Sequence, residues 1–266
     1  MAQSHKLPPA RQIAYGDHPD QAGNLHLPPA DERDGCGGPW PVVVLIHGGF
    51  WTWGWDRTLL TPLARELASR GIAAWNIEYR RVGQEGGGWP GTLEDVAAAA
   101  DAVAGLDGVD PGRVVTVGHS AGGHLALWLA ARRRIAPGYP GAAPRVRPRG
   151  VVSLAGVTDL ARGAEDGLGG GACAAPLGGP PRQLPDRYAA ASPTALLPLG
   201  VPVLLVHGGL DDDVPPGQSR AFAHAARAAG DSVELVELEH ADHFDVIEAG
   251  HEAWAAVGDR LPGLLT

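Results

Sequence analysis

The sequence predicts a single α/β domain built on a mainly parallel sheet, and two observations carry this prediction. The chain has 266 residues and a hydrophobic fraction of 44%, which fits one large domain with a sizeable core. Short β-branched runs alternate with longer helical segments, and this order implies right-handed crossovers and helices on both faces of the sheet. The abundant glycines and prolines follow no fixed period, which excludes a collagen-like chain.

Residues 1–39 are expected to form an N-terminal extension with one early strand at Gln12–Tyr15 and otherwise loop. The single domain is expected over 40–266 and opens with Val42–Ile46, a continuous β-branched run typical of a strand buried on both faces. The later strands are expected at Ile72–Tyr79, Val114–Val117, Val151–Leu154, Val203–His207 and Val233–Leu238. The helices are expected at Leu59–Ser69, Thr92–Ala104, Ala121–Arg133, Gln218–Ala229 and Val246–Leu261.

The segment from Gly156 to Gly200 interrupts this alternation. It is rich in glycine, alanine and proline, shows no convincing period, and is longer than a simple connection. It forms either a small cap over an active site or a disordered surface excursion, and the sequence leaves both interpretations open.

A Gly-x-Ser-x-Gly motif at 118–122 is the first candidate for chemistry. It follows the buried strand 114–117 and opens the helix 121–133, the setting that a nucleophile elbow requires. The sharp turn strains the backbone of Ser120, and the flanking glycines remove side chains that would clash. The start of the helix then directs positive charge at a developing oxyanion.

A serine hydroxyl needs a base, because it is a poor nucleophile when neutral. In this arrangement an acid and then a histidine follow the serine along the chain. His240 and His243 lie in the loop after the last expected strand, and spacing favours neither. Asp211, Asp212 and Asp213 follow the preceding strand, and at least one of them is expected to orient the base.

The loop after Val42–Ile46 reads His-Gly-Gly-Phe-Trp over 47–51. Its glycines allow backbone N–H groups to approach a substrate oxygen closely. Together with the N–H of Ala121 they are expected to form an oxyanion hole, in which each donor contributes about 3 kcal/mol in the transition state.

These motifs give the chain, from about Pro41 to its end, a strong resemblance to the α/β-hydrolase superfamily. The resemblance lies in the loop at 47–49, the elbow at 118–122, the pattern His-Gly-x-x-Asp-x-x-Val-Pro at 207–215, and Asp-His-Phe at 242–244. Within the superfamily the loop 47–51 and the run Glu-Tyr-Arg-Arg at 78–81 look similar to arylformamidase-like and hormone-sensitive-lipase-like esterases. The resemblance therefore implies an α/β-hydrolase fold and a serine hydrolase.

The resemblance also implies roles for single residues. Asp211 becomes the acid, rather than Asp212 or Asp213, and His243 becomes the base. Gly49 and Phe50 become the oxyanion donors of the loop. The lipase-type pattern has a third glycine where this chain has Phe50, so the added side chain is expected to narrow the pocket.

Several aromatic side chains lie near these motifs. We assign Trp51, His119 and Trp89 to the substrate pocket, and Trp53 and Trp55 lie beside the same loop. Aromatic walls suit an aryl or alkyl ester or an aryl amide, but packing in the core explains any single indole equally well.

The function implied is hydrolysis of small to medium carboxylic esters through an acyl-enzyme, with no cofactor and no metal. An amidase or arylformamidase using the same triad is the alternative, and a non-catalytic binding module is a second one. The small-molecule ester or amide is the expected partner, and the chain is expected to be a monomer or homodimer.

Charge and cysteine content limit the remaining possibilities. A net charge of −9 and a pI near 5.6 argue against nucleic acid or an anionic membrane as partner. The densest basic stretch, 132–134, is interpreted as a solvated helix end. Cys36 and Cys173 are interpreted as loop thiols of a reducing compartment, although a disulfide between them is possible. No apolar leader or membrane span is found in the sequence, so we expect a soluble cytoplasmic protein.

Overall fold

The computed structural model describes residues 7–29 and 38–266. Its strands are β1 (Arg11–Ala14), β2 (Ala22–His26), β3 (Trp40–Ile46), β4 (Ala73–Ile77), β5 (Val109–His119), β6 (Gly150–Leu154), β7 (Val203–Gly208) and β8 (Val233–Leu238). Its α-helices are α1 (Thr61–Ser69), α2 (Gly91–Ala102), α3 (Ala121–Ala131), α4 (Leu160–Glu165), α5 (Pro185–Ala191), α6 (Gly217–Ala228) and α7 (Glu252–Leu264). Short 3-10 helices cover 57–60, 103–105, 132–134, 168–171, 175–177, 193–196 and 245–247.

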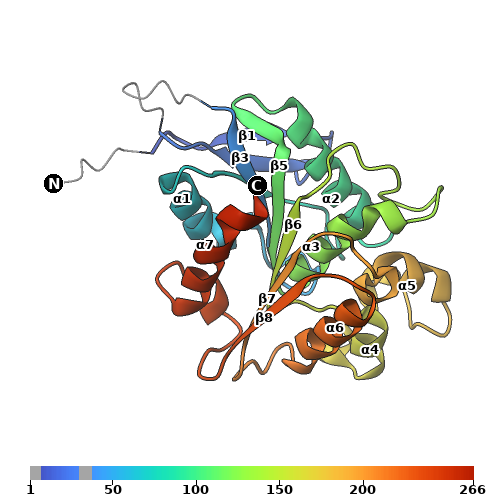
Figure 1. Cartoon of the computed structure of the whole chain (residues 1–266). Coiled ribbons are helices and arrows are strands. Elements are labelled where there is room, and N and C mark those ends of the chain that lie inside the picture. The colour runs from blue at the N-terminus through green and yellow to red at the C-terminus, as the bar shows by residue number, and fades with distance from the viewer. Residues whose placement is uncertain (1–6, 30–37) are drawn as a thin grey trace.

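The strands form one sheet in the order β1-β2-β4-β3-β5-β6-β7-β8 (Figure 1). Strands β3 to β8 run parallel, whereas β1 and β2 are joined antiparallel at one edge. The predicted fold class, a mainly parallel α/β sheet, is confirmed. The parallel order brings the carboxyl ends of β3, β5, β6, β7 and β8 to one edge of the sheet, where the chemistry of such folds lies.

The prediction of loop after the first strand is wrong for β2, which pairs with β4. Its sequence Ala-Gly-Asn-Leu-His lacks a β-branched run, so local propensity gives little signal. It is a strand because the edge of β4 supplies an antiparallel partner, with Leu25 opposite Trp75. A Cβ atom on Gly23 would overlap the Trp75 ring, so glycine lets the indole pack against this strand.

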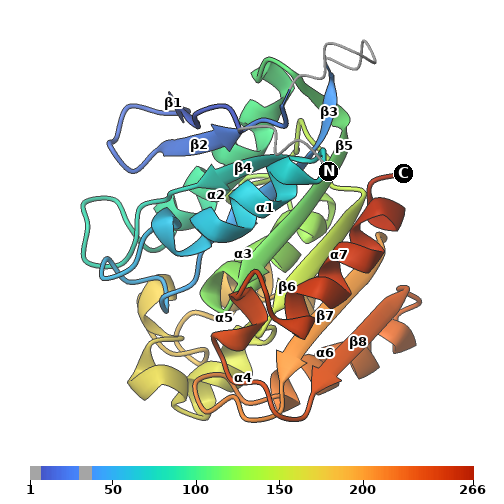
Figure 2. The same cartoon turned by 90° about the vertical axis from the view of Figure 1, so that its left-hand side faces the viewer.

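Helices cover both faces of the sheet, as the alternating pattern predicts. Side chains of α1 and α7 pack with one set of strand residues, which includes Val43 and Leu45. Side chains of α2, α3 and α6 pack on the opposite face with Val42 and Val44. Figure 2 shows α1 and α7 together on one side of the sheet. Among the described residues no helix has the length and apolar character to cross a bilayer.

The segment 156–200 is ordered, so the interpretation as a disordered excursion is wrong. Two short helices, α4 and α5, and several 3-10 turns replace the period that the sequence lacks. They are held by packing, because Leu160, Leu177 and Tyr188 are buried in the same cluster as α2, α3 and α6. In Figure 1 this segment lies beside α6. Cys173 is also buried there, and burial raises the pKa of its thiol to about 12; Cys36 lies outside the described residues.

The basic stretch at 132–134 is less solvated than predicted. The side chain of Arg132 is buried and contacts both carboxylate oxygens of Asp101, at 3.0 and 2.8 Å. The paired charges explain how an arginine is tolerated there, since a buried charge needs a partner. The neighbouring Arg133 and Arg134 are exposed, as expected.

Candidate active site

Ser120 lies at the turn between β5 and α3 and adopts φ 56° and ψ −120°. Residues other than glycine rarely adopt this backbone conformation. It costs on the order of 1–3 kcal/mol and must be enforced by the surrounding structure. The Ser120 N–H donates to the carbonyl of Leu154 at 2.8 Å, and the Ser120 carbonyl accepts from the N–H of His124 at 3.1 Å. A Cβ atom on Gly118 would overlap the carbonyl of Gly122. The motif therefore folds as the elbow that the sequence predicts.

Asp211 and His243, which the family resemblance selects among the candidates in the loops after β7 and β8, are hydrogen-bonded to each other. Nδ1 of His243 lies 2.7 Å from Oδ2 of Asp211. A carboxylate can only accept, so Nδ1 carries a proton, and in the neutral ring Nε2 is the nitrogen with the lone pair. His240, the alternative base, is exposed, whereas His243 is only 5% exposed.

The carboxylate of Asp211 is held ionised by its neighbours. Its Oδ1 accepts from the N–H groups of Val214 at 2.7 Å and Asp213 at 3.0 Å. Nε2 of His207 lies 3.2 Å from Oδ2. Burial alone would raise the pKa of Asp211, but hydrogen bonds from His207, His243 and Val214 outweigh it and hold the pKa well below its usual range.

The ring of His119 is hydrogen-bonded to the backbone of His243. Its Nε2 lies 2.8 Å from the carbonyl oxygen of His243 and must be the donor, because a carbonyl only accepts. The two rings are 4.6 Å apart. Burial, with the nearby His243, lowers the pKa of His119 to about 3, so its ring stays neutral. His119 therefore restrains the loop that carries His243.

Ser120, His119 and His243 line one cavity of about 170 Å³. It is lined by Gly49, Phe50, Trp55, Leu59, His119, Ser120, Asp213, His243 and Phe244. Trp55 and Phe244 are stacked at 5.8 Å between ring centroids and are 43% and 42% exposed, so they form its rim. Four of the lining residues, Trp55, Leu59, Asp213 and Phe244, had no pocket assignment from the sequence, although Trp55 belongs to the aromatic group noted beside the loop.

The loop at 47–51 reaches this cavity through a run of left-handed residues. Gly49 has φ 107°, and the next two residues, Phe50 and Trp51, have φ 49° and 58°. A Cβ atom on Gly48 would lie 2.9 Å from Cβ of Ser120, so glycine allows the loop to approach the serine. The third predicted donor, Ala121, is the first residue of α3, where backbone N–H groups have no partner within the helix.

A buried cluster of charges anchors the beginning of this loop. Nε2 of His47 lies 2.8 Å from Oε1 of Glu78, and Arg81 contacts the same oxygen at 3.1 Å. The N–H of Arg57 donates to the other oxygen at 2.9 Å. Burial raises the pKa of Glu78, but these donors and the arginine charge outweigh it and lower the pKa. The Tyr79 hydroxyl also donates to the His47 carbonyl. The Glu-Tyr-Arg-Arg run thus holds the beginning of the loop through buried hydrogen bonds and ion pairs.

The assignment of Trp51 and Trp89 to the substrate pocket is not supported, because both line a separate small cavity on the inner side of the loop. The left-handed turn at 50–51 reverses the chain and directs Trp51 into the core, where it is 1% exposed. Trp53 is 71% exposed. The three indoles of the Trp-x-Trp-x-Trp run therefore have three different environments.

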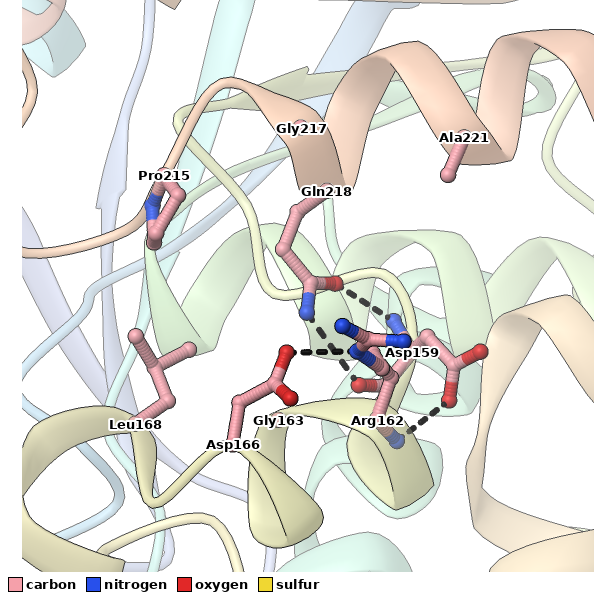
Figure 3. A pocket seen from close by; sticks show the side chains of 9 residues that line it. All are labelled: Asp159, Arg162, Gly163, Asp166, Leu168, Pro215, Gly217, Gln218 and Ala221. Atoms are coloured by element: carbon pink, nitrogen blue, oxygen red, sulfur yellow. Dashed lines mark hydrogen bonds and ion pairs between the residues drawn. The ribbon is translucent and has the colours of Figure 1, made fainter.

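A second cavity, of about 280 Å³, lies between α4 and α6 (Figure 3). The Gln218 side chain crosses it and accepts from the N–H of Asp159 at 2.9 Å, while Arg162 pairs with Asp166 at its rim. Its wall includes Leu168 and Pro215. The residue after Leu168 is Gly169, where a Cβ atom would overlap the Phe50 ring. The segment 156–200 thus lines this cavity and packs against Phe50, one of the residues that line the smaller cavity.

Comparisons with known proteins agree with this fold. A probable carboxylic ester hydrolase of Mycobacterium tuberculosis, LipM, is 30% identical over 92% of this chain and 58% of its own length. A probable isoprenylcysteine alpha-carbonyl methylesterase of rice, Oryza sativa subsp. japonica, is 28% identical over 89% and 58%. This chain therefore spans less than two thirds of both relatives.

Among solved structures, esterase 2 of Thermogutta terrifontis with bound butyrate is 25% identical, with a TM-score of 0.72 over 96% of this chain and 91% of that one. This likeness confirms the α/β-hydrolase fold. The model of one family, BD-FAE, matches residues 26–226, which is most of the described sheet and the elbow. The chain belongs to the BD-FAE family and has the α/β-hydrolase fold of the esterases that it resembles.

Proposed function

We propose that the protein hydrolyses carboxylic esters through a covalent acyl-enzyme, with Ser120 as nucleophile, His243 as base and Asp211 as the acid that orients it. The observation that carries the proposal is the hydrogen bond between His243 Nδ1 and Asp211, at the cavity that also contains strained Ser120. The names of the relatives, an ester hydrolase and a methylesterase, support the same reaction class.

In the first half-reaction Oγ of Ser120 attacks the ester carbonyl carbon while Nε2 of His243 takes its proton. Asp211 stabilises the imidazolium that forms. The N–H groups of Gly49, Phe50 and Ala121 are proposed to bind the oxyanion, each contributing about 3 kcal/mol in the transition state. The imidazolium then protonates the leaving alcohol, and the acyl group stays on the serine.

In the second half-reaction His243 removes a proton from water, which attacks the acyl carbon. The second tetrahedral intermediate collapses with return of the proton to Ser120, and the carboxylic acid leaves. Every proton in this cycle moves through the imidazole of His243, so the position of this ring matters in each step. Two hydrogen bonds restrain it: Asp211 accepts from Nδ1 of His243, and His119 donates to the backbone carbonyl of His243.

The cavity favours small acyl groups. Its volume of about 170 Å³ is below the range of 300–1,000 Å³ that is common for drug-sized ligands. Phe50 stands in its wall where the lipase-type pattern has glycine, and Leu59 adds apolar surface. The butyrate bound to the Thermogutta esterase is an acyl group of this size. We therefore propose acetyl to butyryl esters as the substrate range.

The test compares hydrolysis of p-nitrophenyl acetate and butyrate by the wild type and by Ser120→Ala. We expect the variant to lose about a million-fold in kcat. Ser69→Ala, which changes an exposed serine on α1, is the matched control and should keep the wild-type rate. Equal rates for the wild type and Ser120→Ala would refute the proposal and favour a non-catalytic binding module.

An arylformamidase is the alternative, because the same groups can expel an aryl amine instead of an alcohol. The small cavity with the aromatic rim of Trp55 and Phe244 would accept a formyl group with an aryl leaving group. Comparing kcat/KM for phenyl acetate and an N-formyl arylamine on one preparation distinguishes the two. A larger value for the formamide would replace the ester assignment.

A further inference from the structure

The left-handed turn of the 47–51 loop needs an explanation, because neither Phe50 nor Trp51 is glycine. An L-residue in this region costs roughly 1–2 kcal/mol, and here two occur in succession. The turn is closed locally by the N–H and the hydroxyl of Thr52, which donate to the Gly49 carbonyl at 2.9 and 2.8 Å. These bonds define the turn but do not fix the direction of the Trp51 side chain.

The Trp51 side chain is held by His124, which lies on α3 one turn after Ser120. The indole N–H donates to Nδ1 of His124 at 3.2 Å, and the two rings meet edge to face at 5.2 Å. Both side chains are buried, with exposures of 1% and 2%. This contact joins the loop of the proposed oxyanion donors to the helix that follows the proposed nucleophile.

The partners of His124 fix the state of its ring. Nε2 lies 2.9 Å from the carbonyl of Ala191 on α5, so Nε2 must carry a proton. Nδ1 faces an indole N–H, which can only donate, so Nδ1 must carry a lone pair. The ring is therefore neutral with the proton on Nε2. Burial lowers the pKa of His124 to about 4, which agrees with this state.

We propose that His124 is a positioning residue: its neutral ring holds Trp51, and through it the left-handed turn that aims the N–H groups of Gly49 and Phe50 into the cavity. The inference rests on the proposed function, because it assigns His124 to the same oxyanion hole. His124 does not line the catalytic cavity. Its effect therefore acts on transition-state stabilisation rather than on substrate contact, and kcat should change more than KM.

The variants separate this role from simple packing. His124→Asn can keep an acceptor near the position of Nδ1, and His124→Gln can keep only the donor to Ala191. Trp51→Phe removes the indole N–H and keeps a ring in the core. We expect Trp51→Phe and His124→Gln each to lower kcat for p-nitrophenyl acetate by about tenfold with little change in KM, and His124→Asn to keep most of the rate.

The double variant Trp51→Phe/His124→Gln should lose no more than the worse single variant, because both changes break one interaction. An unchanged kcat in Trp51→Phe would overturn the inference. So would a loss in the double variant equal to the product of the two single losses, or losses that only follow the fraction of folded protein seen by thermal unfolding.

The ring state provides a readout independent of activity. The ¹⁵N NMR signals of His124 should show a protonated Nε2 and an unprotonated Nδ1 at pH 7, and the Trp51 indole N–H signal should shift in His124→Gln. The opposite tautomer would overturn the inference whatever the activity. If the wild type and Ser120→Ala hydrolyse esters equally, the proposed function fails and the catalytic role of His124 fails with it, while the ring state can still be as stated.

Discussion

Replacing the proposed acid by its amide, Asp211→Asn, tests the site most directly. The amide oxygen can still accept from Val214 and Asp213, which lie at 2.7 and 3.0 Å, so the loop should keep its shape. The amide NH₂ then replaces Oδ2 and faces two imidazole nitrogens, Nδ1 of His243 at 2.7 Å and Nε2 of His207 at 3.2 Å. Two donors cannot bond to each other, so His243 must move its proton to Nε2 and lose its function as base.

In serine proteases the same exchange lowers kcat by about 10⁴, which corresponds to about 5 kcal/mol in the barrier. We expect a loss of this size in kcat for p-nitrophenyl acetate, with KM changed little. The neighbouring Asp212→Asn is the matched control, because Asp212 is exposed and its change should leave kcat within about twofold. Equal kcat values for the two variants would refute the assignment of Asp211 as the acid.

Three further predictions concern the pocket, the elbow and acid stability. Phe50→Ala should raise the kcat/KM ratio of butyrate to acetate esters by about tenfold, because each methylene accommodated in an apolar pocket contributes about 1–3 kcal/mol. Gly122→Ala should prevent soluble expression, since its Cβ would overlap the Ile46 carbonyl, whereas Gly263→Ala meets no atom and should keep the wild-type Tm. The lowered pKa of His124, about 4, means that the unfolded chain binds more protons below the ordinary histidine pKa of about 6.5. The free energy of unfolding should therefore fall as pH drops from about 6.5 to 4, by about 3 kcal/mol from this group. Chemical unfolding at a series of pH values should show a smaller fall for His124→Gln than for the wild type.

The sequence predicts the parallel core of the fold well, because each buried strand has its own local signal. The run Val42–Ile46 is fully buried in the structure, as its β-branched composition indicates. Strand β2 has no such signal and depends on Trp75 and the edge of β4, which are distant in the chain. The short helices of the segment 156–200 could not be predicted for the same reason. Contacts of residues such as Leu160 and Tyr188 with the core determine them.

The spacing of motifs does not distinguish among the three aspartates at 211–213, whereas the family resemblance selects one of them. Asp211, Asp212 and Asp213 are chemically identical and adjacent. All three follow the same strand, so the strand pattern is equally compatible with each of them as the residue that orients the base. The structure provides the physical distinction, since Asp211 is 6% exposed and receives two backbone N–H bonds, while the other two are exposed. Only a carboxylate anchored in this way can be aimed at an imidazole, because an exposed one is free to rotate.

The strand order explains why the segment 156–200 reaches Phe50 in the wall of the proposed site. The loop of the proposed oxyanion donors follows β3 and Ser120 follows β5, whereas Asp211 and His243 follow β7 and β8. Strand β6 lies between β5 and β7, so the chain that leaves it must emerge between Ser120 and Asp211. The exit is tight, because a Cβ atom on Gly156 would overlap the Ser153 hydroxyl. An insertion at this point therefore starts beside the proposed site, and one of its residues, Gly169, packs against Phe50 of the cavity wall.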